Sequence, residues 1–348
     1  MNILLGDISS YKAIVVAKFL KKNYPSIKIF SFDTRKFTRS IYTKYSDYNI
    51  IIRDDSITEF LAIIKKYNID YFFPVINEKL NEIWKNKSIF GDTLNYLGKY
   101  EDYSLLNNKT SLYELAKELS ILVPEKFETL DEANIPYIVK PTNLSSAKGV
   151  IYVNNLKDKP KINTYKDIII QQYIKGVGVG YSFYCWEGKI INGYGHKRLA
   201  EYPITGGSSA YRRHYDDNRM YTIAKKIVSS LNYSGFAMFE FKLTSDNKLY
   251  LLEVNPRIWG SINQGLANGY NYFEKILGPV KVTQKIKINH TYTYLGPLIY
   301  ISLFRYFLKF NIKPTFIFIK NCLRNSADVN MILDLKGYFS ILLRKFLK

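Results

Sequence analysis

The stretch GFAMFEFKLTSDNKLYLLEVNPR, residues 235–257, decides the fold expected for this chain of 348 residues. Apolar residues over 236–243 and 249–254 predict two strands, and the polar residues between them predict a turn. If residues 245–248 form the loop, Thr244 faces Leu249 and Glu240 lies directly opposite Glu253. Glu253 and Asn255 share one face of their strand, because side chains alternate along a strand with a period of two. Three oxygen-bearing side chains are therefore expected on one patch.

This patch indicates a metal site. Opposed carboxylates on paired strands, with Cβ atoms about 5 Å apart, repel each other unless a cation or a proton intervenes. Mg²⁺ prefers oxygen ligands and is usually held by one or two carboxylates together with substrate phosphates. We expect Glu240, Glu253 and Asn255 to bind Mg²⁺ (or Mn²⁺), and Arg257 to bind an anion. The alternative is a solvated outer face of a sheet.

A second candidate site is the loop at 142–149, which lies between predicted strands at 137–140 and 150–153. Hydroxyls, a backbone amide and lysine charges of this flap suit a phosphate group, and they come from Ser145, Ser146, Gly149, Lys140 and Lys148. An ordinary solvent loop is the alternative. The string G-x-x-x-x-G-K-S/T is missing from the sequence, which excludes P-loop kinases and GTPases.

The first 95 residues predict a parallel α/β domain. Strands are expected at 2–5, 27–31, 49–52 and 71–75, with helices at 11–22 and 57–67. Gly6 is the only glycine in the first turn, so no dinucleotide-binding loop is expected. Residues 97–124 predict a helical connection in which Asn108 or Thr110 caps a helix at 111–119.

Strands are also expected at 168–174 and 181–186, with a bend between them at Gly176, Gly178 and Gly180. The pattern along the chain divides it into four units, which are 1–95, 96–175, 176–280 and 281–348.

Composition supports a globular chain with two or three domains, because 47% of its residues are hydrophobic and 23% are charged. The two cysteines, Cys185 and Cys322, are far apart, which argues against a disulfide framework and a thiolate zinc site. No pair of the three histidines has the i, i+4 spacing of a helical zinc site. The beginning of the chain lacks the pattern of a signal peptide, so a cytoplasmic location is expected.

The net charge is +20, and residues 281–348 carry 12 lysines and arginines against two aspartates. Such a surplus can attract anionic lipid, nucleic acid or the polyphosphate of a nucleotide. The apolar run at 295–304 is too short to span a bilayer, so it predicts a core helix or a helix on a membrane surface. Nucleic acid is not the expected partner, because the aromatic residues are scattered rather than interleaved with basic ones. Peripheral membrane contact through the tail stays an alternative.

Three strings in fixed order resemble the ATP-grasp superfamily: YIVKP at 137–141, SSAKG at 145–149 and LEVNPR at 252–257. The resemblance runs from about residue 1 to 275 and is most similar to carboxylate–amine ligases with the carbamoyl-phosphate-synthase type of ATP-binding module. It implies a mixed α/β and α+β fold. An N-terminal parallel α/β domain, a small central flap domain and a C-terminal antiparallel sheet domain would precede a basic helical tail. ATP would bind between the last two domains.

The resemblance also implies roles for single residues. Lys109 and Lys140 would contact the nucleotide phosphates, and the flap around Ser146 and Gly149 would close over them. Four residues would border the adenine: Gln171, Gln172, Tyr173 and Ile174. Glu240, Glu253 and Asn255 match the metal ligands, and Arg257 matches an arginine that stabilises charge on the transferring phosphate or the acyl substrate. The chain departs from the family pattern at 177–180, where an acidic residue that binds the ribose is replaced by Val and Gly.

The stretch between the glycines and the hairpin contains Gly206-Gly-Ser-Ser flanked by arginines. This pattern favours a mobile loop that closes over an anionic substrate, and we assign Arg198 and Arg212 to the catalytic set with Arg257. Ordinary surface charge is the alternative.

These observations predict an ATP-dependent ligase that activates a carboxylate as an acyl phosphate and couples it to an amine, releasing ADP and phosphate. No plausible Cys/His or Ser/His pair offers a protein nucleophile, and this chemistry needs none. The alternatives are a kinase or carboxylase on the same fold, and a basic module that binds nucleic acid or a membrane. The partners expected are a small carboxylate and a small amine, whose identities the residue pattern leaves undetermined, as it does the oligomeric state.

Overall fold

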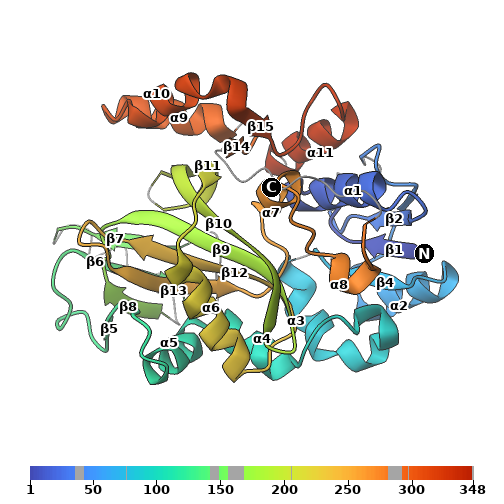
Figure 1. Cartoon of the computed structure of the whole chain (residues 1–348), viewed down its shortest axis with the longest axis horizontal. Coiled ribbons are helices and arrows are strands. Elements are labelled where there is room, and N and C mark those ends of the chain that lie inside the picture. Colours follow the sequence, from blue (N-terminus) through green and yellow to red (C-terminus); the bar gives the residue numbers. More distant parts are fainter. Residues whose placement is uncertain are drawn as a thin grey trace.

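A computed structural model of the chain describes residues 1–35, 43–75, 77–141, 149–155, 168–204, 206–280, 292–296 and 298–346. Figure 1 shows three sheets with helices packed around them, and the last helices at one edge of the molecule. The predicted sites Ser145, Ser146 and Lys148 lie outside the described residues. None of the described helices has the length and apolar content to cross a lipid bilayer.

The N-terminal sheet is parallel and has the strand order β3-β2-β1-β4, which confirms the predicted α/β domain. Its strands are β1 (Asn2–Leu5), β2 (Lys28–Phe32), β3 (Tyr48–Ile50) and β4 (Tyr71–Phe73), and its helices are α1 (Tyr11–Asn23) and α2 (Ile57–Lys66). Helix α1 begins after Ser10 because the Ser10 hydroxyl accepts the backbone N–H of Ala13. The first turn of α1 therefore lies at the carboxyl edge of the sheet.

A helical connection follows, with α3 (Asn77–Lys85), a 3-10 segment at Lys87–Leu94, α4 (Tyr100–Asn107) and α5 (Lys109–Glu118). The side chain of Asn108 accepts the backbone N–H groups of Thr110 and Ser111, so Asn108 is the cap of α5. Lys109 is consequently fixed in the first turn of this helix.

The central sheet is antiparallel, with the order β5-β8-β6-β7. Its strands are β5 (Lys126–Phe127), β6 (Tyr137–Pro141), β7 (Ile151–Val153) and β8 (Ile168–Gln172). Four buried residues form a small core that is separate from the main one: Tyr137, Val139, Val153 and Ile170. The central sheet therefore has its own hydrophobic support.

The third sheet has seven strands in the order β13-β12-β9-β10-β11-β14-β15. The strands are β9 (Val177–Trp186), β10 (Lys189–Tyr202), β11 (Ser208–His214), β12 (Gly235–Leu243), β13 (Leu249–Asn255), β14 (Tyr292–Tyr294) and β15 (Asn325–Ala327). Three helices belong to the same part of the chain: α6 (Asn218–Ser230), α7 (Ile262–Ala267) and α8 (Glu274–Leu277). All its pairs are antiparallel except β14–β15.

The β12–β13 hairpin confirms one part of the predicted register and corrects another. Glu240 pairs with Glu253, as expected, but Leu249 pairs with Leu243 and not with Thr244. The register shifts between Glu240 and Phe241 because β13 contains one extra residue, Leu252, at that point. This bulge brings the two glutamates opposite each other.

The tail is helical in part and also extends the third sheet, which the sequence did not indicate. It contains β14, α9 (Leu298–Leu308), α10 (Lys313–Lys320), a 3-10 turn at Cys322–Arg324, β15 and α11 (Leu335–Phe346). Strand β14 pairs with β11, and β15 pairs with β14. Helix α11 returns to the N-terminal sheet, where both terminal nitrogens of Arg344 donate to Asp7 at 2.5 Å. The tail therefore contacts both the third sheet and the N-terminal domain.

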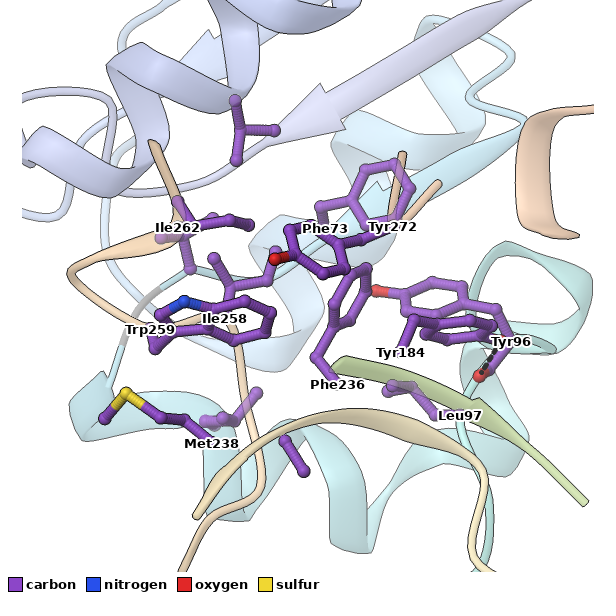
Figure 2. Packing of buried hydrophobic residues seen from close by; sticks show 14 of the residues in the cluster. Phe73, Tyr96, Leu97, Tyr184, Phe236, Met238, Ile258, Trp259, Ile262 and Tyr272 are labelled. Atoms are coloured by element: carbon purple, nitrogen blue, oxygen red, sulfur yellow. Dashed lines mark hydrogen bonds between the residues drawn. The ribbon is translucent and has the colours of Figure 1, made fainter. Parts of the chain in front are cut away.

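One continuous hydrophobic core joins the N-terminal sheet to the third sheet. Figure 2 shows Phe73 of β4 near Phe236 of β12, with Tyr96 and Tyr184 beside them. The Tyr184 hydroxyl donates to the carbonyl of Tyr96 at 2.9 Å. Phe273 is fully buried, and its ring centroid lies 5.3 Å from that of Phe73 and 5.4 Å from that of Phe236. The two sheets are thus held together mainly by aromatic contacts.

Replacing Phe273 with alanine should destabilise the protein by about 3–5 kcal/mol, because it opens a cavity where the two sheets meet. Phe310→Ala is the matched control, since 96% of Phe310 is exposed. Urea unfolding of both variants measures the effect. Equal midpoints for the two variants would show that Phe273 does not carry this interface.

Candidate active site

A cavity of about 700 Å³ lies where the central sheet faces the third sheet. Lysines and arginines outnumber acidic residues in its described lining: Lys12, Lys109, Lys140, Arg198, Lys242 and Arg257 against Glu201, Glu240 and Glu253. Such an excess of positive charge in a concave site favours an anionic ligand. The lining comes from all three sheets or their flanking helices, so the cavity depends on the whole fold.

The opposed glutamates lie at the centre of this lining. The Asn255 amide donates to Glu240 Oε1 and to Glu253 Oε1, at 3.2 Å in both cases. Burial, helped by the charge of Glu253, raises the pKa of Glu240 against the effect of Arg198. Burial acts in the same direction on Glu253, but Lys109 and Lys140 and the Asn255 hydrogen bond outweigh it, so the pKa of Glu253 is lowered. The two carboxyl groups therefore differ in how strongly they hold a proton.

Cations from four parts of the chain surround this pair. Lys109 Nζ lies 3.5 Å from Glu253 Oε2, and Arg198 forms an ion pair with Glu240. Arg257 Nη2 donates to Asn255 Oδ1 at 2.6 Å. Lys140 is buried and donates to the Tyr113 hydroxyl at 3.4 Å. Burial and the charge of Lys109 lower the pKa of Lys140 to about 7.

Gly178 and Gly180 lie within β9 and not in a bend, which corrects the prediction for these two residues, whereas Gly176 lies at a bend just before the strand. A Cβ at Gly178 would lie 2.8 Å from Arg198 Cδ, and one at Gly180 would lie 2.5 Å from His196 Cε1. Both distances are too short for ordinary contacts. The strand therefore carries glycine where side chains of the neighbouring strand β10 cross it. Arg198 gains its access to Glu240 in this way.

Of the residues expected to border an adenine, Gln171 and Gln172 end β8, and Tyr173 and Ile174 follow it. Gln171, Tyr173 and Ile174 line the cavity. Gln172 is not in the lining: its backbone N–H donates to the carbonyl of Glu125 at 2.8 Å. At the flap, Gly149 has a φ of +72°, and the cavity is lined by its neighbour Val150.

Arg212 takes a different position from the one expected for a catalytic residue. It pairs with Arg198 across β10 and β11, but it is buried and absent from the cavity lining. Its Nη2 lies 2.5 Å from Asp328 Oδ1, and both side chains are almost fully buried. The tail strand β15 brings Asp328 to this place. The guanidinium of Arg212 is therefore occupied by a structural ion pair.

The N-terminal domain adds residues that the sequence analysis missed: Ser10, Tyr11 and Lys12. Lys12 is buried, and its Nζ donates to the carbonyl of Ile258 at 3.4 Å. Burial, with the charge of Arg257, lowers the pKa of Lys12 well below its usual value. A turn at the carboxyl end of the first parallel strand is a common ligand position, and this signal could have identified the three residues.

The donor set at the hairpin fits a hard divalent cation. The two directly opposed carboxylates offer oxygen ligands, and the Asn255 amide, whose nitrogen donates to both of them and whose oxygen accepts from Arg257, would add a third oxygen if it rotated. No group of three or more His, Cys, Asp or Glu side chains with metal-site geometry occurs in the described part of the chain. Mg²⁺ in nucleotide sites is commonly held by one or two carboxylates, with phosphates completing the shell, so these residues suit it.

Comparisons with known proteins show what this chain is similar to. Residues 106–261 match the family model described as the ATP-grasp domain. The solved structures that the chain resembles have the same fold. The biotin carboxylase of Campylobacter jejuni has a TM-score of 0.67 at 16% identity, over 84% of this chain and 74% of that one. Residues 106–261 are therefore similar to the ATP-grasp domain, and the predicted resemblance is confirmed.

Two further proteins are similar to this chain. The L-amino acid ligase of Bacillus licheniformis has a TM-score of 0.63 at 15% identity, covering 85% of this chain and 80% of the ligase. A 5-formaminoimidazole-4-carboxamide-1-(beta)-D-ribofuranosyl 5'-monophosphate synthetase of Sulfolobus acidocaldarius is 24% identical over 191 residues, which are 52% of this chain and 55% of the synthetase. The chain thus spans about half the length of the curated relatives it matches.

The Arg212–Asp328 pair gives a prediction about stability. Arg212→Met should cost about 3–5 kcal/mol, because it leaves the buried carboxylate of Asp328 without a partner. The double variant Arg212→Met/Asp328→Leu should recover most of that loss. Urea unfolding compares the two. A single variant within about 0.5 kcal/mol of the parent, as for a surface substitution, would contradict the structural role.

Proposed function

We propose that this protein is an ATP-dependent ligase that converts a carboxylate to an acyl phosphate and couples it to an amine. The observation that carries the proposal is the half-buried Glu240–Glu253 pair with Asn255, surrounded by basic residues in a cavity large enough for a nucleotide. The ATP-grasp domain and the similarity to a protein named as an L-amino acid ligase support it. Glu240, Glu253 and Asn255 would hold Mg²⁺, which supplies positive charge to the phosphate oxygens.

The reaction would proceed in two displacements. A carboxylate oxygen attacks the γ-phosphorus, the bond from that phosphorus to the β,γ-bridging oxygen breaks, and ADP leaves. The nitrogen of the amine then attacks the acyl carbon, the carbon–oxygen bond breaks, and phosphate leaves as the nitrogen loses a proton. No covalent bond to the protein forms in either step.

The residues of the chain would act through charge and position. Lys109 and Lys140 lie on the Glu253 side of the pair and would neutralise phosphate oxygens. Arg257, which is half-buried beside Asn255, would stabilise charge on the transferring group or the acyl substrate. Gln171, Tyr173 and Ile174 would border the adenine. Arg198 would orient Glu240 through their ion pair, and its charge opposes the rise in the pKa of Glu240 that burial causes.

The products of ATP turnover test this assignment. With ATP, Mg²⁺ and a panel of carboxylic acids, the protein should release ADP and phosphate, and hydroxylamine should trap the acyl phosphate as a hydroxamate. AMP and pyrophosphate would contradict γ-phosphoryl transfer. ADP formed without a hydroxamate or an acid requirement would favour the kinase. Turnover that requires bicarbonate would favour a carboxylase, the activity named for one of the similar structures.

Glu253→Gln tests the metal assignment, because it keeps the shape of the side chain and removes one charge from the pair. We expect turnover to fall by about 100-fold or more and to require more Mg²⁺, since charge stabilisation at a reacting phosphate is worth that much. Glu114→Gln on the exposed face of α5 is the control and should keep the parent rate. Full activity of Glu253→Gln at limiting Mg²⁺, in a variant with an unchanged melting temperature, would falsify the assignment.

A further inference from the structure

Helices α9 and α10 lie side by side at the outer edge of the molecule (Figure 1). Their inner faces are packed. Ile299, Leu303 and Tyr306 of α9 and Ile317 and Phe318 of α10 join a cluster built on β10, β11 and β14. The two helices, with the turn between them and the 3-10 turn that follows, form what we call the α9–α10 hairpin, residues 298–324.

Two hydrogen bonds fix α9 to the third sheet. The Ser302 hydroxyl donates to the carbonyl of Glu201 at 2.6 Å, and the backbone N–H of Glu201 donates to the Tyr306 hydroxyl at 3.3 Å. The backbone N–H and the carbonyl of Glu201, a residue of β10, are thus both hydrogen-bonded to this helix. The outer face of the hairpin is therefore displayed from a firmly seated element.

The outer face is apolar to an unusual degree. Large side chains are exposed on it at helical spacing: Tyr300, Phe304, Phe307 and Leu308 on α9, and Phe316 and Ile319 on α10. Each of these six is exposed by 60% or more. Phe310 in the turn is 96% exposed and Leu323 is 98% exposed. Many large apolar side chains exposed on two adjacent helices of a folded protein mark a place of interaction.

The same hairpin is purely basic. It carries Arg305, Lys309, Lys313, Lys320 and Arg324, and the sequence has no Asp or Glu from residue 281 to residue 327. All five basic residues are exposed. A second copy of this face placed against it would bring like charges together, which opposes self-association. The occupant must therefore offer apolar contact and negative charge at once.

We propose that the α9–α10 hairpin docks this protein on a membrane surface containing anionic phospholipids. The aromatic and aliphatic side chains would enter the boundary between headgroups and acyl chains, and the five basic residues would contact the lipid phosphates. The helices are 11 and 8 residues long, which is too short to cross the bilayer and suits a position in its plane. The contact is peripheral and reversible.

Flotation of the full chain with vesicles tests the proposal. Vesicles of phosphatidylcholine alone are compared with vesicles that contain about 30% phosphatidylglycerol, a composition that gives a negative surface potential. At about 0.05 M salt we expect about tenfold or more protein to float with the anionic vesicles, and about 0.5 M salt should reduce that fraction strongly. No flotation with anionic vesicles at low salt would overturn the proposal.

Paired variants separate the apolar component of lipid binding from the electrostatic one. Phe307→Asp/Phe316→Asp should abolish flotation, whereas Ile51→Asp/Ile89→Asp, at residues 67% and 55% exposed elsewhere, should not change it. Lys309→Glu/Lys313→Glu should lose the preference for anionic vesicles, and Lys65→Glu/Lys66→Glu on α2 should keep it. Equal losses in the hairpin and control variants would show nonspecific adsorption and overturn the proposal.

Two further readouts exclude other occupants. A tryptophan introduced as Phe307→Trp should be quenched by brominated phospholipids, beyond the quenching of the parent, because residue 307 would lie at acyl-chain depth. No added quenching would overturn the insertion. If gel filtration of the parent shows a dimer that Phe307→Asp dissociates, the face binds a second copy and the membrane proposal fails.

Discussion

The repulsion between Glu240 and Glu253 is the constraint around which the cavity is arranged. Two carboxylates directly opposed on neighbouring strands destabilise a sheet, and burial raises that cost unless each charge has a partner. The partners come from separate elements: Lys109 from the first turn of α5, Lys140 from the central sheet and Arg198 from β10. The central and third sheets must therefore lie close together for both carboxylates to have cationic partners. The same convergence creates the concave, positively charged space.

The hairpin that carries this pair shows why part of the site could be predicted from the sequence. Glu240 and Glu253 lie close to a short turn, so pairing from the turn reaches them within a few residues. The predicted turn began one residue too late, since Leu243 and not Thr244 pairs with Leu249. The bulge at Leu252 shifts the register by one residue and cancels that error at Glu240. The alternation of side chains along the two strands therefore predicted correctly that Glu240 and Glu253 share a face, although it gave no indication of the bulge.

Contacts between distant segments explain what the sequence did not indicate. Arg212 and Asp328 are separated by 116 residues, and Arg344 and Asp7 by 337, so no local pattern relates them. Gly178 was interpreted as a bend because glycine is unfavourable inside a strand, whereas the structure uses it to admit the side chain of Arg198. Lys12 reaches the cavity only because α1 packs against α7. Each of these features depends on which elements become neighbours.

The tail strands also decide how the third sheet ends. At one side, α4 and α5 pack against β13. At the other, the described sheet finishes with β15, three residues long, after the equally short β14 has covered β11. A long, bare edge strand is a template for pairing with another chain, and short or covered strands remove it. Without β14, β15 and Asp328, β11 would present such an edge beside the uncompensated charge of Arg212. The tail thus protects the sheet from edge-to-edge aggregation.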